Sequence, residues 1–198
     1  MKSFFKEAVR TLKTSGTVRP SSKYLIRACI KNINFEEAKT VLEFGTGDGC
    51  FTREIAARLR ADAVLYSFEV NPSFFDYCNK QFAPLANVHI LNHSAIDFDT
   101  ILGEEGITQV DYVVSSLPLS LLKEDMVRNM LGKVTRYLRP GGLFIQYQYS
   151  PEKYFLLKKY FDKVEIELSV RNLPPAVVYK CSNKARVGQK ADPHDPER

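Results

Sequence analysis

Cysteine is scarce in this sequence, and the few that occur are not spaced as metal ligands. Four cysteines stand far apart in 198 residues, with no C-x-x-C pair. A zinc site or a disulfide framework is therefore not expected, and reduced thiols of a cytoplasmic protein are the natural interpretation. No cluster of histidines, cysteines and carboxylates points to another metal.

Long apolar runs are also missing. The sequence contains no stretch of about 18 uncharged apolar residues, so no membrane-spanning helix is expected. The N-terminus has no continuous apolar segment, so a secretory signal is not expected either. The chain is 44% hydrophobic, which is enough for one domain with a full core.

The positive charge is concentrated at the N-terminus. Residues 1–31 hold eight lysines and arginines against Glu7 alone, so they carry a charge of +7 while the whole chain sums to +5. This excess suggests a local contact with an anionic partner. Residues 2–13 predict a helix in which Phe4, Phe5, Ala8, Val9 and Leu12 share one arc.

From residue 40 the pattern alternates between strand and helix, which favours a doubly wound, mostly parallel α/β sheet. We expect strands at 40–44, 63–69, 88–92, 110–115, 143–149, 163–168 and 176–181. Helices are expected at 22–30, 50–60, 72–82, 123–138 and 151–160. About seven residues join the last two strands, too few for a crossover helix, so these strands should pair antiparallel.

The sharpest motif is the glycine-rich turn Glu43-Phe44-Gly45-Thr46-Gly47-Asp48-Gly49, between a strand and a helix. Glycines there allow the backbone to approach a ligand closely. A dinucleotide fingerprint would need glycine at Cys50, and a carboxylate at Glu43 would repel a pyrophosphate but attract a cation. S-adenosylmethionine carries a sulfonium and an ammonium, and Glu69 at the end of the second strand could accept hydrogen bonds from its ribose.

These features resemble class I S-adenosylmethionine-dependent methyltransferases, over roughly residues 40–181. The resemblance implies a Rossmann-like seven-stranded sheet with an antiparallel last strand. At the place of the family's adenine-binding Asp stands Ser94, with Asp97 as a possible substitute. The implied cofactor residues are Glu43, Gly45, Thr46, Gly47, Gly49, Glu69, Val70, Ser94, Ala95 and Ser115.

The loop after the fourth strand, Ser115-Ser116-Leu117-Pro118-Leu119, should border the methyl acceptor. Base-amino methyltransferases carry N-P-P-Y or N-L-P-Y there, whereas Ser116 replaces the Asn and Leu119 the aromatic that stacks on a base. Together with the segments at residues 4–6, 16–22 and 171–176, the sequence of this loop resembles that of bacterial phospholipid N-methyltransferases. The resemblance implies an enzyme that acts on phosphatidylethanolamine and binds membranes through an N-terminal helix. Their near relatives, the rRNA adenine dimethyltransferases, remain the competitor.

Physical features of the N-terminal helix agree with a membrane partner. Phe4 and Phe5, flanked by the cations Lys2, Lys6, Arg10 and Lys13, have the composition of an interfacial helix on an anionic leaflet. Packing of this helix on the domain, or RNA binding by its cations, are the alternatives. The protein is expected to be peripheral on the inner face of the membrane.

Methyl transfer to a lipid amine needs alignment and removal of a proton. The candidate catalytic residues are Tyr24, Ser116, Pro118 and Tyr147, with His93 and Tyr149 as further proton acceptors. Arg19 or Arg171 could hold a phosphodiester. The predicted organisation is a basic helical segment at 1–31, a methyltransferase domain at 32–181 and a polar tail at 182–198. An rRNA adenine N6-dimethyltransferase and a cofactor-binding module without turnover remain alternatives.

Overall fold

The computed structural model describes residues 21–172 and 174–183. The predicted helix at 2–13, with its phenylalanines and cations, and most of the polar tail lie outside the described residues. Within them a seven-stranded sheet runs in the order β3-β2-β1-β4-β5-β7-β6. Its strands are β1 Thr40–Phe44, β2 Val64–Phe68, β3 Val88–Leu91, β4 Val110–Ser115, β5 Leu138–Gln148, β6 Lys163–Ser169 and β7 Ala176–Ser182.

The first five strands are mutually parallel, and β7 is antiparallel to both β5 and β6. The predicted mostly parallel sheet and its terminal hairpin are therefore confirmed. Since β7 lies between β5 and β6, β6 runs parallel to the first five strands. The carboxyl ends of β1 to β6 consequently meet at one edge of the sheet, here called the carboxyl edge.

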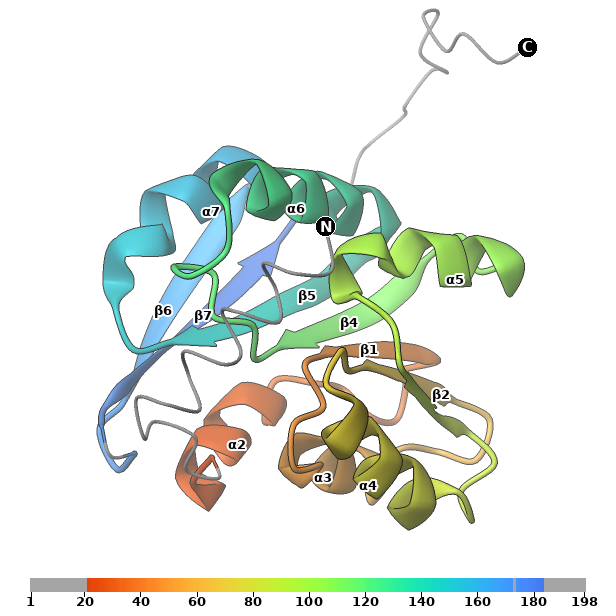
Figure 1. Cartoon of the computed structure of the whole chain (residues 1–198). Coiled ribbons are helices and arrows are strands. Elements are labelled where there is room, and N and C mark those ends of the chain that lie inside the picture. Colours follow the sequence, from red (N-terminus) through yellow and green to blue (C-terminus); the bar gives the residue numbers. More distant parts are fainter. Residues whose placement is uncertain (1–20, 173, 184–198) are drawn as a thin grey trace, which may run out of the picture.

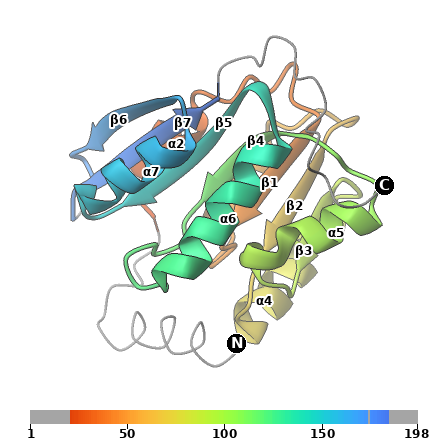
Figure 2. The same cartoon turned by 90° about the horizontal axis from the view of Figure 1, so that it is seen from above.

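Helices cover both faces of the sheet (Figures 1 and 2). One layer holds α2 Lys23–Ile30, α3 Cys50–Ala56 and α4 Pro72–Phe82, and the other holds α5 Phe98–Glu104, α6 Glu124–Tyr137 and α7 Tyr154–Tyr160. Short 3₁₀ turns, η1 Ala95–Asp97 and η2 Pro151–Lys153, precede α5 and α7. None of the helices in these described ranges has the length and hydropathy needed to cross a membrane.

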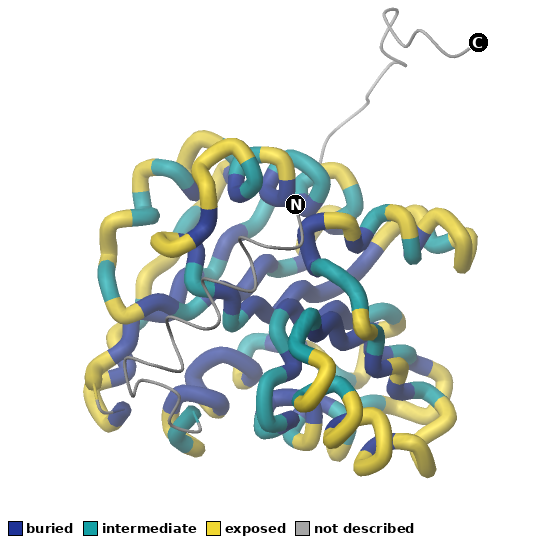
Figure 3. Tube along the Cα trace, in the orientation of Figure 1, coloured by how far each residue is buried: buried dark blue, intermediate teal, exposed yellow. Residues whose placement is uncertain are grey.

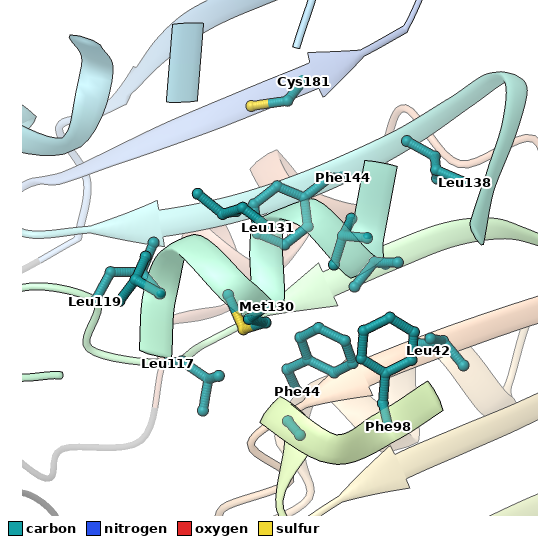
Figure 4. Packing of buried hydrophobic residues seen from close by; sticks show 14 of the residues in the cluster. Leu42, Phe44, Phe98, Leu117, Leu119, Met130, Leu131, Leu138, Phe144 and Cys181 are labelled. Carbon is teal, nitrogen blue, oxygen red and sulfur yellow. The ribbon is translucent and has the colours of Figure 1, made fainter. Parts of the chain in front are cut away.

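Each face of the sheet carries its own apolar core, and the buried residues lie between the layers (Figure 3). Figure 4 shows the core under α5, α6 and α7, where Phe44, Phe98 and Met130 pack together. Leu117 and Leu119 belong to the same core and are 4% and 0% exposed. The loop after β4 is thus anchored in the core on its apolar side, which fixes the loop beside the carboxyl edge.

Helix α2 is an integral part of its layer. Ser22 caps it, because its side chain accepts a hydrogen bond from the Leu25 amide at 3.2 Å. Leu25, Cys29 and Ile30 are 0 to 4% exposed in the core beneath α2 and α3. The predicted helix at 22–30 is therefore confirmed within one residue, and it starts at the carboxyl edge.

Two elements differ from the sequence-based expectation. Helix α5 was not predicted, because seven residues with a Gly give too short a periodic signal. Strand β5 begins at Leu138, although Arg139-Pro140-Gly141-Gly142 predicts a break before residue 143. A register shift opposite Val110 and Tyr112 absorbs this break and lets Leu138 pair with Val110.

Candidate active site

The glycine-rich turn lies where the strand order changes direction. The chain proceeds from β1 to β2 and β3 on one side, then returns to place β4 on the other side of β1. Ligands of open α/β sheets bind at such a switch point, beyond the carboxyl ends of the strands. The predicted cofactor residues after β1, β2, β3 and β4 are therefore brought to one edge by the parallel topology.

Hydrogen bonds to β2 hold the turn in place. The amides of Gly45 and Thr46 donate to the Phe68 carbonyl at 2.9 and 3.2 Å. Gly45 has a φ of 87°, and a Cβ there would lie 2.4 Å from the Ser116 Oγ. Gly47 has a φ of 56° and no heavy atom within 4 Å of a Cβ position. The backbone at Gly47 therefore faces open space, as close approach of a ligand requires.

Glu69 ties the turn to the end of β2. Its Oε2 accepts a hydrogen bond from the Gly47 amide at 2.9 Å, and its Oε1 accepts one from the Asn71 amide at 2.7 Å. The side chain of Asn92 donates to the Glu69 carbonyl at 2.9 Å. A carboxylate offers about four acceptor positions, so this fixed group has the capacity to accept hydroxyl donors as well as the two amides.

Glu43 lies beneath the turn rather than on its open side, and it is 1% exposed. Its Oε2 accepts hydrogen bonds from the hydroxyls of Thr52 and Ser67, both at 2.7 Å. Because Ser67 donates to Glu43, the hydroxyl of Thr46, 2.6 Å away, must donate to Ser67. The Oε1 atom of Glu43 has no hydrogen-bond partner among the described residues.

Burial raises the pKa of Glu43 to about 7, and the hydrogen bonds from Thr52 and Ser67 partly oppose that rise. A carboxyl group with this pKa is poised between its neutral and ionised forms near neutral pH. A cation bound at the turn would favour the ionised form. The turn therefore covers a buried carboxyl group with one oxygen bonded to two hydroxyls and the other without a partner among the described residues.

Two cysteines flank the turn. The Cys78 Sγ donates to the Gly47 carbonyl at 3.4 Å, and the Cys50 amide donates to Asp48 at 3.2 Å. Burial raises the pKa of each thiol to about 12. This shift favours the neutral thiol over the thiolate, which is the nucleophilic form.

On the β3 side of the edge, Ser94 caps η1 by accepting a hydrogen bond from the Ile96 amide at 3.2 Å. Ala95 is 3% exposed, and Asp97 is exposed. Val70 and Ser94 are half-buried near the ends of β2 and β3. These residues lie at the carboxyl edge beside the ends of β2 and β3, on the side of Glu69.

The loop after β4 is fixed by both neighbouring strands. The Ser116 hydroxyl donates to the carbonyls of Phe44 at 3.1 Å and Gly45 at 2.9 Å. Gln146 and Gln148 each donate through Nε2 to the Leu117 carbonyl, at 3.0 and 2.8 Å. Ser115 is buried and Pro118 is half-buried. Ser116 therefore joins the loop to the glycine turn.

Tyr147 lies on β5, the strand that contacts this loop, and is half-buried. Its ring stacks on Phe51 with centroids 5.8 Å apart, and it meets the Tyr149 ring edge-on at 6.1 Å. Its hydroxyl lies 3.3 Å from the Ser21 Oγ. Burial raises the Tyr147 pKa above that of an ordinary tyrosine, so the hydroxyl stays protonated at neutral pH.

Tyr24 lies at the start of α2, beside the β6–β7 turn. The Arg171 guanidinium carbon lies 5.5 Å from its ring centroid, and Lys23 Nζ lies 5.6 Å from it. The Ser22 amide donates to Asn172 Oδ1 at 3.4 Å. These contacts place Tyr24 and Arg171 at the carboxyl edge, on the side of β5 and β6.

His93 does not share this region. It follows β3, which is four strands away from β5, or about 19 Å at the usual spacing between strands. The structure therefore separates His93 from Tyr147, although the sequence offered both as proton acceptors for one reaction.

Several contributors at this edge were missed from sequence. Thr52, Ser67, Gln146 and Gln148 were given no role, although all four are at most 6% exposed. Polar residues inside otherwise apolar strands and helices were the available signal, because buried polar groups are almost always hydrogen-bonded. Which carboxylate or carbonyl they would meet depends on neighbouring strands and helices.

Comparisons with known proteins agree with this geometry. A family model described as a methyltransferase domain matches residues 41–142. An ornithine lipid N-methyltransferase of Singulisphaera acidiphila is 35% identical over 167 residues, which cover 84% of this chain and 87% of that protein.

Solved structures show the same architecture. The N-methyltransferase NodS of Bradyrhizobium japonicum WM9 superposes with a TM-score of 0.64 at 14% identity, covering 81% of this chain and 92% of that one. A precorrin-6y C5,15-methyltransferase of Geobacter metallireducens GS-15 reaches 0.64 at 12% identity, covering 82% and 89%.

The fold and the glycine-rich turn define a Rossmann-like methyltransferase. The chain belongs to the methyltransferase domain family, as a class I methyltransferase that uses S-adenosylmethionine. The residues present fit this cofactor, since the open backbone at Gly47, the fixed Glu69 carboxylate and the partnerless Glu43 Oε1 match a cationic nucleoside. No group of three or more His, Cys, Asp or Glu side chains within the described ranges could hold a metal ion.

Proposed function

We propose that this enzyme methylates the amine of an aminolipid headgroup, of the phosphatidylethanolamine type, at a membrane surface. The observation that carries the proposal is the 35% identity, along most of both chains, to a protein named as an ornithine lipid N-methyltransferase. This identity supports an amine on a lipid as the acceptor, and ornithine lipid is the other headgroup to test, because it also presents a primary amine.

The proposed cofactor site is the set predicted from sequence. The turn from Gly45 to Gly49, with Thr46 buried beneath it, holds the methionyl part, and Glu69 accepts the ribose hydroxyls. Glu43 supplies negative charge for the ammonium. Val70, Ser94 and Ala95 border the adenine, and Ser115 ends β4 beside the transferable methyl. When bound, the cofactor supplies a methyl group on a positively charged sulfur.

The proposed acceptor site lies between the loop after β4 and the aromatic residues of β5 and α2. Ser116 and Pro118 form the wall nearest the glycine turn, and Tyr147 offers an aromatic face to a methylated ammonium. Since its raised pKa keeps Tyr147 protonated, we assign it to positioning the amine rather than to removing the proton. Arg171 stacks near Tyr24 and could pair with a phosphodiester.

Recognition of an RNA adenine has less support. Leu119 occupies the place of the base-stacking aromatic, and it is 0% exposed within the core. A buried aliphatic residue offers no face to a flipped base. A nucleobase acceptor would have to find its stacking partner elsewhere on this edge.

The acceptor is tested by incubating the protein with methyl-labelled S-adenosylmethionine and one of three acceptors. These are phosphatidylethanolamine vesicles, ornithine lipid vesicles and rRNA. We expect label in lipid. Label in RNA alone would reverse the proposal, and label in none, with S-adenosylhomocysteine still bound, would indicate a binding module without turnover.

An Arg171→Gln variant should separate the two headgroups. If Arg171 holds the phosphodiester, kcat/KM of the variant on phosphatidylethanolamine should fall about tenfold, as expected for the loss of one charged hydrogen bond. Its kcat/KM on ornithine lipid should change little. Lys158→Gln, on the exposed side of α7, is the control. Equal losses on both lipids would remove this role from Arg171.

Cofactor affinity should depend on pH through Glu43. At pH 6 about one tenth of a carboxyl group with a pKa near 7 is ionised, so S-adenosylhomocysteine should bind roughly tenfold more weakly at pH 6 than at pH 8. Calorimetry in buffers of different ionisation enthalpy should detect proton release on binding at pH 6. Glu43→Gln should bind without this release, and a wild-type affinity unchanged between the two pH values would contradict the role of Glu43.

A further inference from the structure

Exposed apolar side chains gather at the carboxyl edge. Nine large hydrophobic residues of the described chain are exposed, and six of them lie at this edge. We call these six the apolar rim, and they are Tyr24, Leu121, Tyr149, Phe155, Leu168 and Val170. Ile166 continues the rim along β6, and the other two, Tyr77 and Leu85, lie in and after α4.

The topology explains why these residues meet. Leu121 follows β4, Tyr149 follows β5, and Leu168 and Val170 end and follow β6. Those three strands run in the same direction, so their ends share one edge. Phe155 stands in the first turn of α7, which follows β5 after the short 3₁₀ turn η2. It therefore lies near the same edge.

The described residues leave the side chains of the rim largely exposed to solvent, so these side chains do not serve the packing of the domain core. Phe155 is 76% exposed, Val170 is 66% and Leu168 is 60%. Scattered exposed apolar residues are ordinary, but a group of them beside a ligand site is typical of an interaction surface. This group surrounds the proposed acceptor loop on the β4, β5 and β6 side.

The charges around the rim favour an anionic partner. Lys23, Lys123, Lys153 and Arg171 lie on the same loops and helix starts as the apolar side chains. The acids among them are fewer. Glu124 is engaged by Arg128, which leaves Asp125 and Glu152 as the other acidic side chains on these loops and helix starts. On β6, Glu165 pairs with Lys163, and Glu167 pairs with Lys31 and Lys180, so their charges are compensated. Apolar side chains interspersed with cations match a leaflet that contains anionic lipids.

We infer that the apolar rim of the folded domain docks on an anionic membrane, with Phe155 and Val170 inserted among the lipids. This inference rests on the proposed function for what the surface delivers, because docking by this edge turns the acceptor loop toward the bilayer. A lipid headgroup then reaches the site without leaving the membrane. The surface is distinct from the N-terminal helix predicted at 2–13, and it adds a second point of attachment.

The test compares two matched double variants of the full chain. Phe155→Ser/Val170→Ser removes the most exposed apolar groups of the rim, and Tyr77→Ser/Leu85→Ser removes exposed apolar groups from the α4 region. Co-sedimentation is measured without cofactor, using phosphatidylcholine vesicles with and without phosphatidylglycerol. We expect the rim variant to bind phosphatidylglycerol vesicles about tenfold more weakly than wild type, and the α4 variant to bind as wild type. Both variants should melt at the wild-type temperature.

Two results would overturn docking by the rim. One is unchanged vesicle binding by the rim variant while Phe4→Ser/Phe5→Ser loses it, which would leave attachment to the N-terminus alone. The other is a wild-type dimer in sedimentation velocity that the rim variant dissociates, which would make the rim an interface between copies.

Failure of the proposed function is detected separately. A short-chain aminolipid below its micelle concentration should be methylated equally by wild type and the rim variant, since it needs no membrane. If wild type methylates no aminolipid at all, the function is wrong, while the vesicle measurements still decide whether the rim docks.

Discussion

A Glu69→Gln variant is expected to bind S-adenosylhomocysteine at least about thirtyfold more weakly than wild type, while remaining folded. The carboxylate accepts hydrogen bonds from the amides of Gly47 at 2.9 Å and Asn71 at 2.7 Å. Glutamine keeps one acceptor and turns an NH₂ group toward the other amide, so one backbone donor loses its partner. It also loses an acceptor for the ribose. Loss of about 2 kcal/mol in charged hydrogen bonding corresponds to this factor.

Isothermal calorimetry measures the change, and Glu105→Gln is the matched control because Glu105 is exposed and remote from the turn. Circular dichroism establishes that both variants are folded. Equal affinities for wild type and Glu69→Gln would remove the ribose role from Glu69, even though the hydrogen bonds to the turn would still explain its burial.

A Glu43→Gln variant should be more stable than wild type at pH 8 without cofactor, and yet bind the cofactor less well. Burial raises the Glu43 pKa to about 7 in the folded protein, against 4.5 for the ordinary group. The folded state therefore binds more protons than the unfolded state between these values, so stability falls as pH rises from about 4.5 to 7. The shift corresponds to about 3 kcal/mol, and glutamine, which stays neutral, avoids that loss.

Thermal unfolding at pH 5 and pH 8 checks this sign. We expect the variant to exceed wild type by about 2–3 kcal/mol at pH 8 and by little at pH 5. Saturating S-adenosylhomocysteine should narrow the difference at pH 8, because it stabilises wild type more. A variant that is less stable than wild type at pH 8 would mean that Glu43 is held ionised by groups other than Thr52 and Ser67.

The alternation of strands and helices was sufficient to predict the sheet and its hairpin. Strands such as 40–44 and 110–115 are short apolar runs between turn residues, and their burial on both faces is what a central parallel strand requires. Helix α5 escaped prediction, because seven residues carry too little periodic signal. The early start of β5 depends on pairing with Val110, a contact between residues far apart in sequence.

The sequence also placed the glycine turn and the two acids near a common site, but it did not orient them. Alternation along β1 puts Leu42 and Phe44 in one core and turns Glu43 toward the opposite face. There it meets Thr52 from α3 and Ser67 from β2. A carboxylate expected to face the ligand is instead buried under the turn, and its pKa near 7 follows from that burial.

By itself the sequence determined the elements other than α5 and the start of β5, because local periodicity and turn residues dictate helices, strands and the positive-φ glycine turn. It also determined the class of ligand, because two acids accompany that turn and a cysteine stands at position 50, where a dinucleotide fingerprint needs glycine. Only the tertiary structure decided which polar groups share the site and which, like His93, lie strands away. Strand order brings together residues that are remote in sequence, and the same order gathers the exposed apolar side chains of three strand ends onto one edge.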